Sequence, residues 1–149
     1  MTIAILWPTF VLVALVFAVW AGMFVNHVVW ARRGAVQPRR DRPGEMAINP
    51  DDPQMPTRNL ANLFEMPVLY FALVPLLMLT RHADHTQVAL AWTFVLLRIG
   101  HSVVHIARAP LGLRFAFWLL SCVALAAMWA GFAIDMAAAA AAMPPGYGA

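Results

Sequence analysis

Four long apolar runs dominate this chain of 149 residues, and polar or charged residues separate them. An α-helix needs about 20 mostly apolar residues to cross the hydrocarbon core of a bilayer, and each run meets that length. Because 62% of the residues are hydrophobic and only 11% are charged, the composition predicts an integral membrane protein. We therefore predict an all-α fold in which residues 1–149 form one domain, a four-helix transmembrane bundle. The expected helices cover about residues 3–31, 58–80, 86–108 and 111–140.

The placement of arginine predicts how the bundle lies in the membrane. Residues 32–57 contain five arginines and five prolines, which predicts a loop, and residues 108–114 contain two more arginines. Because positively charged loops stay in the cytoplasm, both loops are expected there, with both termini on the opposite side. The net charge of +3 does not indicate nucleic-acid binding, since the arginines lie mainly at helix ends and lysine is absent. Residues 143–149 are expected to form a disordered tail.

A carboxylate interrupts the second apolar run. Arg58, Asn62 and Glu65 fall within an arc of about 60° on a helix, so they form one polar stripe. A carboxylate at membrane depth costs several kcal/mol unless it is protonated, solvated or paired. We therefore expect Glu65 to face the bundle interior and to meet a cationic partner. Arg98, inside the third apolar run, is the candidate partner.

The third predicted helix has its polar residues on one face, within an arc of about 100°. These residues are Arg98, His101, Ser102 and His105, and the opposite face includes Leu96 and Val103. At about 1.5 Å per residue, Glu65 and His101 both lie about 10 Å from the cytoplasmic surface. Antiparallel packing of the two helices would therefore gather six side chains into one group, which we call the polar seam. The polar seam consists of Arg58, Asn62, Glu65, Arg98, His101 and His105.

Two motifs on these helices resemble the paired signatures of the MAPEG family, the membrane-associated proteins of eicosanoid and glutathione metabolism. They are Arg58-x3-Asn62-x2-Glu65-x-Pro67 and Arg98-x2-His101-x3-His105. The resemblance covers all four predicted helices and is closer to the uncharacterised bacterial branch of the family than to its leukotriene and prostaglandin synthases. It implies a homotrimer in the bacterial inner membrane that binds glutathione between neighbouring protomers, near the cytoplasmic side.

The resemblance also implies roles for individual residues. Glutathione, as a co-substrate, would be bound by the polar seam, with Arg58, Asn62, Glu65 and Arg98 on its peptide part. Arg114 matches the arginine that stabilises the thiolate and is the catalytic candidate. Position 105 departs from the pattern, because the glutathione-binding members usually have Tyr where this chain has His105.

The expected function is that of a glutathione-dependent transferase or peroxidase acting on a lipophilic electrophile that arrives from the bilayer. A guanidinium beside a thiol lowers the pKa of that thiol and raises its thiolate fraction. One alternative is a non-enzymatic trimeric scaffold, or an accessory subunit of a larger membrane complex, in which Glu65 and Arg98 fix the helix register. A haem or metal site using His27, His101 or His105 is the least favoured, since three histidines near one interface arise readily by chance.

Overall fold

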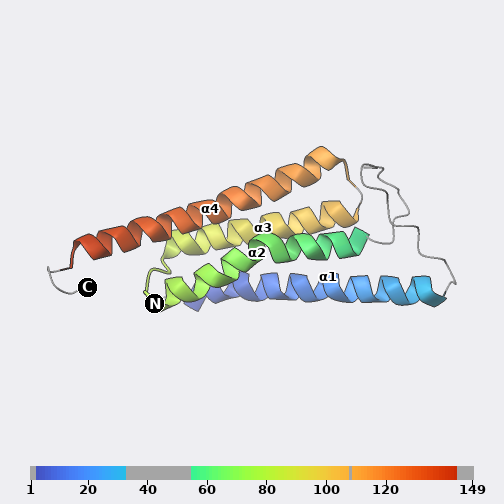
Figure 1. Ribbon diagram of the computed structural model, residues 1–149, viewed down its shortest axis with the longest axis horizontal. Coiled ribbons are helices and arrows are strands. Elements are labelled where there is room, and N and C mark those ends of the chain that lie inside the picture. Colours follow the sequence, from blue (N-terminus) through green and yellow to red (C-terminus); the bar gives the residue numbers. More distant parts are fainter. Residues whose placement is uncertain (1–2, 33–54, 108, 144–149) are drawn as a thin grey trace.

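The computed structural model describes residues 3–32, 55–107 and 109–143, without the side chains of residue 30 and residues 55–64. All regular structure within these residues is helical, which confirms the predicted all-α class. A short 3-10 helix η1 (Ile3–Ile5) leads into α1 (Leu6–Arg32), and α2 (Met55–Leu79), α3 (His85–Ile106) and α4 (Leu111–Ala141) follow. The four long helices run along one common axis, and the start of α1 lies toward the same end as the last turn of α4 (Figure 1).

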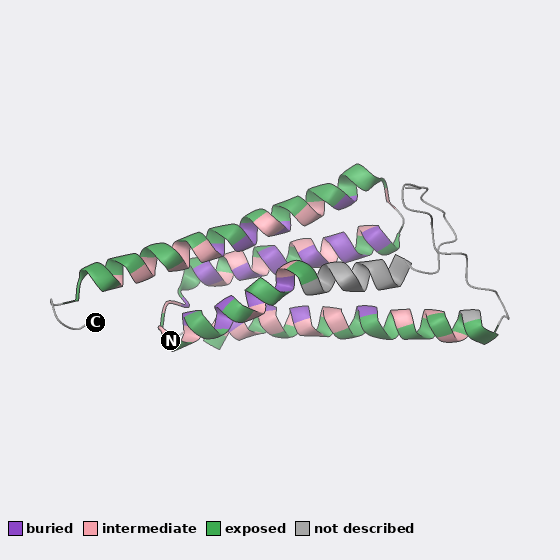
Figure 2. Cartoon of the chain, in the orientation of Figure 1, coloured by how far each residue is buried: buried purple, intermediate pink, exposed green. Residues whose placement is uncertain are grey.

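Three helices of the described chain are long and apolar enough to cross a membrane. The spans are Ile3–Val29, His85–Ile106 and Leu111–Ala141, and the described apolar part of α2 is Glu65–Leu79. Large apolar side chains cover the outside of α1 and α4, whereas buried residues are concentrated on α3 (Figure 2). This pattern, apolar outside with polar groups inside, is typical of a bundle that has lipid as its solvent.

Two helix ends differ from the predicted ones. The second helix begins at Met55 and not near residue 58, so Pro56 lies in its first turn. A proline is tolerated there because the first N–H groups of a helix have no intrahelical acceptor. The third helix ends at Ile106 and not at residue 108, because Pro110 lacks an N–H and disfavours helix in the residue before it. The predicted tail and most of the loop at residues 32–57 lie outside the described residues.

The bend in α2 has an identifiable cause. Pro67 and Pro75 both lie inside this helix, and each removes a backbone hydrogen bond and displaces the preceding turn. Figure 1 shows α2 changing direction along its length. The bend gives the two halves of α2 different directions within the bundle.

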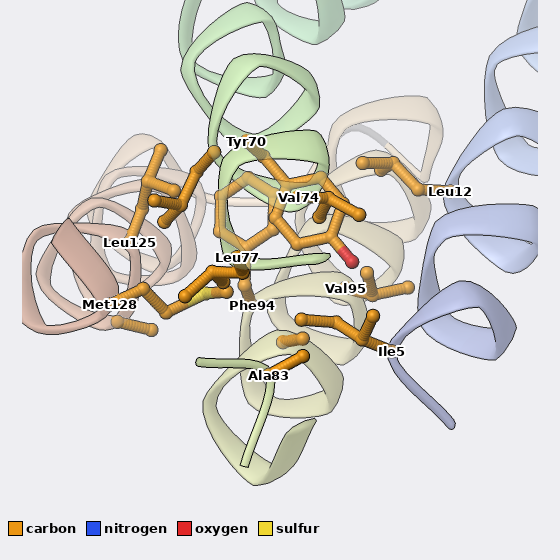
Figure 3. Packing of buried hydrophobic residues seen from close by; sticks show 13 residues of the cluster. Ile5, Leu12, Tyr70, Val74, Leu77, Ala83, Phe94, Val95, Leu125 and Met128 are labelled. Carbon is orange, nitrogen blue, oxygen red and sulfur yellow. The ribbon is translucent and has the colours of Figure 1, made fainter. Parts of the chain in front are cut away.

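The apolar core occupies one half of the bundle, the half that contains the α2–α3 turn. Its side chains come from η1 and the first turns of α1, the second half of α2, the first half of α3 and the middle of α4 (Figure 3). At its centre Tyr70 stacks on Phe94, with ring centroids 5.1 Å apart and the planes 15° from parallel. The buried polar side chains from Arg98 onward follow the core residues of α3 in the chain, so they lie in the other half of the bundle.

One hydrogen bond links α1 to α2 inside this core. Thr9 donates its hydroxyl proton to the carbonyl of Ile5 (2.9 Å), so the Tyr70 hydroxyl must donate to Thr9 Oγ1 (3.0 Å). Tyr70→Phe is therefore expected to cost only about 0.6 kcal/mol, the average for such bonds between membrane helices. Thr9→Val leaves the buried Tyr70 hydroxyl without its acceptor and should cost about 1–3 kcal/mol. Thermal unfolding in detergent shows which of the two variants is less stable. Equal losses of stability would contradict the assignment of Tyr70 as the donor.

The α3–α4 pair is held together at both ends of its contact. Toward the apolar core, Gln87 Nε2 donates to the carbonyl of Met128 (3.1 Å). Toward the polar half, His101 Nδ1 bonds the carbonyl of Arg114 (3.0 Å). One residue before His101, the missing side chain of Gly100 makes room for the ring of Phe117. These contacts fix the register of α4 against the polar face of α3.

Candidate functional site

The polar face of α3 is buried as its spacing predicts. Arg98 is fully buried, and His101, Ser102 and His105 are at most 6% exposed. On the opposite face Leu96 and Val103 are 59% and 58% exposed. The helical periodicity of these residues is thereby confirmed, and it directs the polar groups of α3 into the bundle.

A cavity of about 360 Å³ opens between α2, α3 and the start of α4. Its volume falls in the range of about 300–1,000 Å³ in which small molecules are bound. The lining divides into two kinds of side chain, ionisable and apolar. The ionisable ones are Glu65, His101, His105 and Arg114, and the apolar ones are Leu111, Phe115 and Trp118. The cavity is therefore suited to a molecule with a charged part and an apolar part.

His101 joins two walls of this cavity. Its imidazole is 4% exposed, and its Nδ1 contacts the Arg114 carbonyl on α4. The ring of His105 lies one helical turn away, with ring centroids 5.8 Å apart and the planes tilted by 48°. The two imidazoles thus stand in succession along one side of the cavity.

Arg114 supplies the positive charge on the α4 wall. It lies in the first turn of α4 and is only 9% exposed. Within the described part of the chain, its Nε has no hydrogen-bond partner. The N-terminus of a helix also favours anions, because its first N–H groups point outward without intrahelical acceptors. This corner of the cavity is consequently arranged for a negative charge.

Glu65 lines the cavity but is exposed on the single chain. The prediction that it faces a shielded interior is therefore wrong for one protomer, because the cavity opens outward at this point. Arg98, the expected partner, interacts electrostatically with Glu65, and a direct ion pair between the two side chains stays a prediction. Arg98 also interacts with Cys122 on α4, a proximity that the sequence around Cys122 does not indicate. Arg98 itself is fully buried and is not among the side chains that line the cavity.

The remaining members of the polar seam cannot be placed at the level of side chains. Arg58 and Asn62 belong to α2, in the stretch whose side chains lie outside the described residues. Of the polar seam and Arg114 together, the structure brings Glu65, His101, His105 and Arg114 to one cavity.

The histidines considered for metal binding are arranged differently. His27 is exposed on α1, where its Nδ1 contacts the carbonyl of Met23 on its own helix (2.9 Å). Among the described residues no group of three or more His, Cys, Asp or Glu side chains is placed to hold a metal ion. His101 uses one ring nitrogen on a backbone carbonyl.

The apolar wall was not anticipated from the sequence. Leu111, Phe115 and Trp118 share one face of α4 with Arg114, and the rings of Phe115 and Trp118 stack at 5.8 Å with the planes 26° apart. Their spacing of four and three residues is the signal that could have identified this face. Once Arg114 is a candidate, its neighbours on the same helical stripe are candidates too.

Comparisons with known proteins identify the family of the chain. No curated protein and no solved structure matches the chain. A protein-family model, that of the MAPEG family, matches residues 5–134 and so covers most of the sequence. This stretch includes all the residues that line the cavity. The chain belongs to the MAPEG family.

Proposed function

We propose that the protein is a glutathione-dependent transferase or peroxidase that acts on a lipophilic electrophile. The observation that supports this most is the divided lining of the cavity, with ionisable side chains on α2 and α3 and an aromatic wall on α4. Glutathione carries an ammonium group, two carboxylates and a thiol, whereas the electrophile is apolar. The ionisable side chains suit glutathione and the apolar side chains suit the electrophile, so the cavity fits the two molecules together.

The charges of the site match those of glutathione. The Glu65 carboxylate suits an ammonium group, and the guanidinium groups of Arg98 and Arg114 suit carboxylate or thiolate. Charge-assisted hydrogen bonds of this kind are about twice as strong as neutral ones. Arg114 is assigned the thiolate because it lies beside the aromatic wall, where the electrophile would be held.

The apolar wall offers a route from the bilayer. Leu111 and Phe115 line the cavity and are still 58% and 57% exposed on the surface of the chain. An apolar substrate dissolved in lipid could therefore reach the cavity sideways, without crossing water. The thiol would arrive from the aqueous side and meet it at Arg114.

The proposal includes the assembly and its orientation. We propose four membrane spans per chain and a homotrimer, in which a neighbouring protomer covers the open side of the cavity beside Glu65. Exposed aromatic residues along α1, among them Trp7, Phe10 and Phe17, provide apolar surface for such a contact or for lipid. Residues 32–57 and 108–114 would face the cytoplasm of a bacterial inner membrane, as the arginine distribution predicts.

Isothermal titration of glutathione into the detergent-purified protein tests this function. The wild-type protein is expected to bind, and His105→Tyr should bind about 2–10-fold more tightly, since a phenol adds one hydrogen bond worth about 0.5–1.5 kcal/mol. His85→Tyr, at the exposed start of α3, is the matched control and should change nothing. The proposal would be contradicted if the wild-type protein releases no heat when glutathione is added and none of its backbone amides becomes protected from hydrogen exchange.

The scaffold alternative makes the opposite prediction. The electrostatic interaction between Glu65 and Arg98 is the observation that favours it, because such pairs can fix helix register without catalysis. A protein that binds no glutathione, and whose oligomer dissociates when Glu65 is replaced with Gln, would support this alternative.

A further inference from the structure

The hydrogen bond between α3 and α4 fixes where His101 carries its proton. A backbone carbonyl can only accept, so in the contact with the Arg114 carbonyl (3.0 Å) the Nδ1 atom of His101 must be the donor. A neutral imidazole has one N–H and one lone pair. The lone pair of His101 is therefore on Nε2, and the backbone of α4 holds it there.

This Nε2 atom is buried at the cavity. His101 lines the cavity and is 4% exposed, and within the described residues its Nε2 has no hydrogen-bond partner. A buried acceptor left unsatisfied costs about 1–3 kcal/mol, so its presence calls for a donor. The site thus holds an acceptor that a ligand can satisfy.

A positive group accompanies this acceptor. Arg114 lines the same cavity and interacts electrostatically with His101, and its Nε likewise has no partner in the described part of the chain. A lone pair and a fixed cation, side by side, are what a weak acid needs to lose its proton: the lone pair takes the proton, and the cation stabilises the anion. A thiol is such an acid.

We propose that His101 is the general base that takes the proton from the bound thiol, an inference that rests on the proposed function. The S–H bond breaks, an N–H bond forms at Nε2, and the electron pair stays on sulfur beside the Arg114 guanidinium. The sulfur then attacks the electrophile and forms an S–C bond. The bond from that carbon to its leaving group, or to the ring oxygen of an epoxide, breaks at the same time; the leaving group or the ring oxygen keeps the electron pair and takes the proton back from Nε2.

The other ionisable groups around the cavity fit this assignment. Glu65 also lines the cavity, where it is exposed and interacts electrostatically with Arg98. When His101 gains a proton near Arg98 and Arg114, the new thiolate and the Glu65 carboxylate offset the added positive charge. Because the two guanidinium groups disfavour a further positive charge, His101 is expected to hold the proton only together with the bound thiolate.

The protonation state of His101, the thiolate absorbance, the dissociation constant of glutathione and the conjugation rate together test the proposal. In protein with ¹⁵N-labelled histidine, the His101 signal should show a protonated Nδ1 and a bare Nε2 without glutathione, and a protonated Nε2 as well once glutathione is bound. The ultraviolet absorbance of the thiolate should appear when glutathione is added to the wild-type protein. In His101→Asn the amide nitrogen can still donate to the Arg114 carbonyl, but the base is lost. We expect its dissociation constant to change by less than about threefold, while the conjugation rate falls about 10²-fold with the thiolate absorbance.

His85→Asn, the same change on the exposed first turn of α3, is the control and should leave all three readouts as in the wild type. Full thiolate absorbance in His101→Asn would overturn the inference and leave the proposed function standing. A protonated Nε2 in the wild-type protein before glutathione is added would do the same, as would a bare Nε2 in a complex that shows the thiolate absorbance. Absence of glutathione binding in the wild-type protein would overturn both.

Discussion

Replacing Arg114 with Ala is expected to lower the rate of glutathione conjugation by about 10²–10³-fold, the usual effect of removing one group that stabilises a developing anion. Arg114 is the cation of the cavity that lies next to its aromatic wall. Without it, a thiol with a pKa near 8.5 stays largely protonated at neutral pH. Initial rates with an apolar aromatic electrophile, measured in nanodiscs, check this result.

Two further variants separate charge from geometry at this position. Arg114→Lys keeps the positive charge but loses the planar fork of donors, so its rate should lie between those of the wild type and Arg114→Ala. Arg81→Ala removes an exposed arginine at the other end of the bundle and should leave the rate unchanged. Equal rates for Arg114→Ala and the wild-type protein would remove Arg114 from the catalytic site.

Replacing Gly100 with Ala is expected to destabilise the bundle by about 1–3 kcal/mol, the cost of overpacking a close contact. A Cβ atom at Gly100 would lie 2.5, 2.8 and 3.2 Å from three ring atoms of Phe117. The ring must then move, and α4 with it. Because His101 and Arg114 are next to this contact, the variant should also weaken glutathione binding. Thermal unfolding in detergent and titration calorimetry measure the two effects.

The chain provides matched controls for this experiment. A Cβ atom at Gly22 or Gly112 meets nothing within 4 Å, so Gly22→Ala and Gly112→Ala should be neutral or stabilise their helices by up to about 1 kcal/mol. Adding Phe117→Leu to Gly100→Ala removes the ring and should recover part of both losses. If Gly100→Ala unfolds at the wild-type temperature, Gly100 does not set the spacing of α3 and α4.

The polar face of α3 could be predicted because burial follows helical periodicity. Arg98, His101 and His105 recur every three to four residues, which places them on one face whatever the partner helix is. The electrostatic interaction of Glu65 with Arg98 was predictable for a related reason. Depth along two antiparallel helices depends only on the rise per residue, and an acid in an apolar run needs a cation.

The cavity itself could not be predicted in the same way. The bond from His101 to the Arg114 carbonyl depends on how far α4 is rotated and shifted against α3, which the fit of Phe117 onto Gly100 helps to fix. Backbone acceptors leave no signature in the sequence. Likewise, the exposure of Glu65 depends on the space left between α2 and α4. The start of α2 was also missed, because a proline such as Pro56 is tolerated in the first turn of a helix but not in its interior.

The separation of the apolar core from the cavity has a consequence for motion. Tightly packed rings around Tyr70 should make one half of the bundle the slowest to exchange its amide hydrogens, with opening free energies near that of global unfolding. The other half, where polar groups border empty volume, can open locally at lower cost. For the proposed function, this predicts that electrophiles of different shapes are admitted by loosening one end of the helices, while the far end keeps the four segments in register.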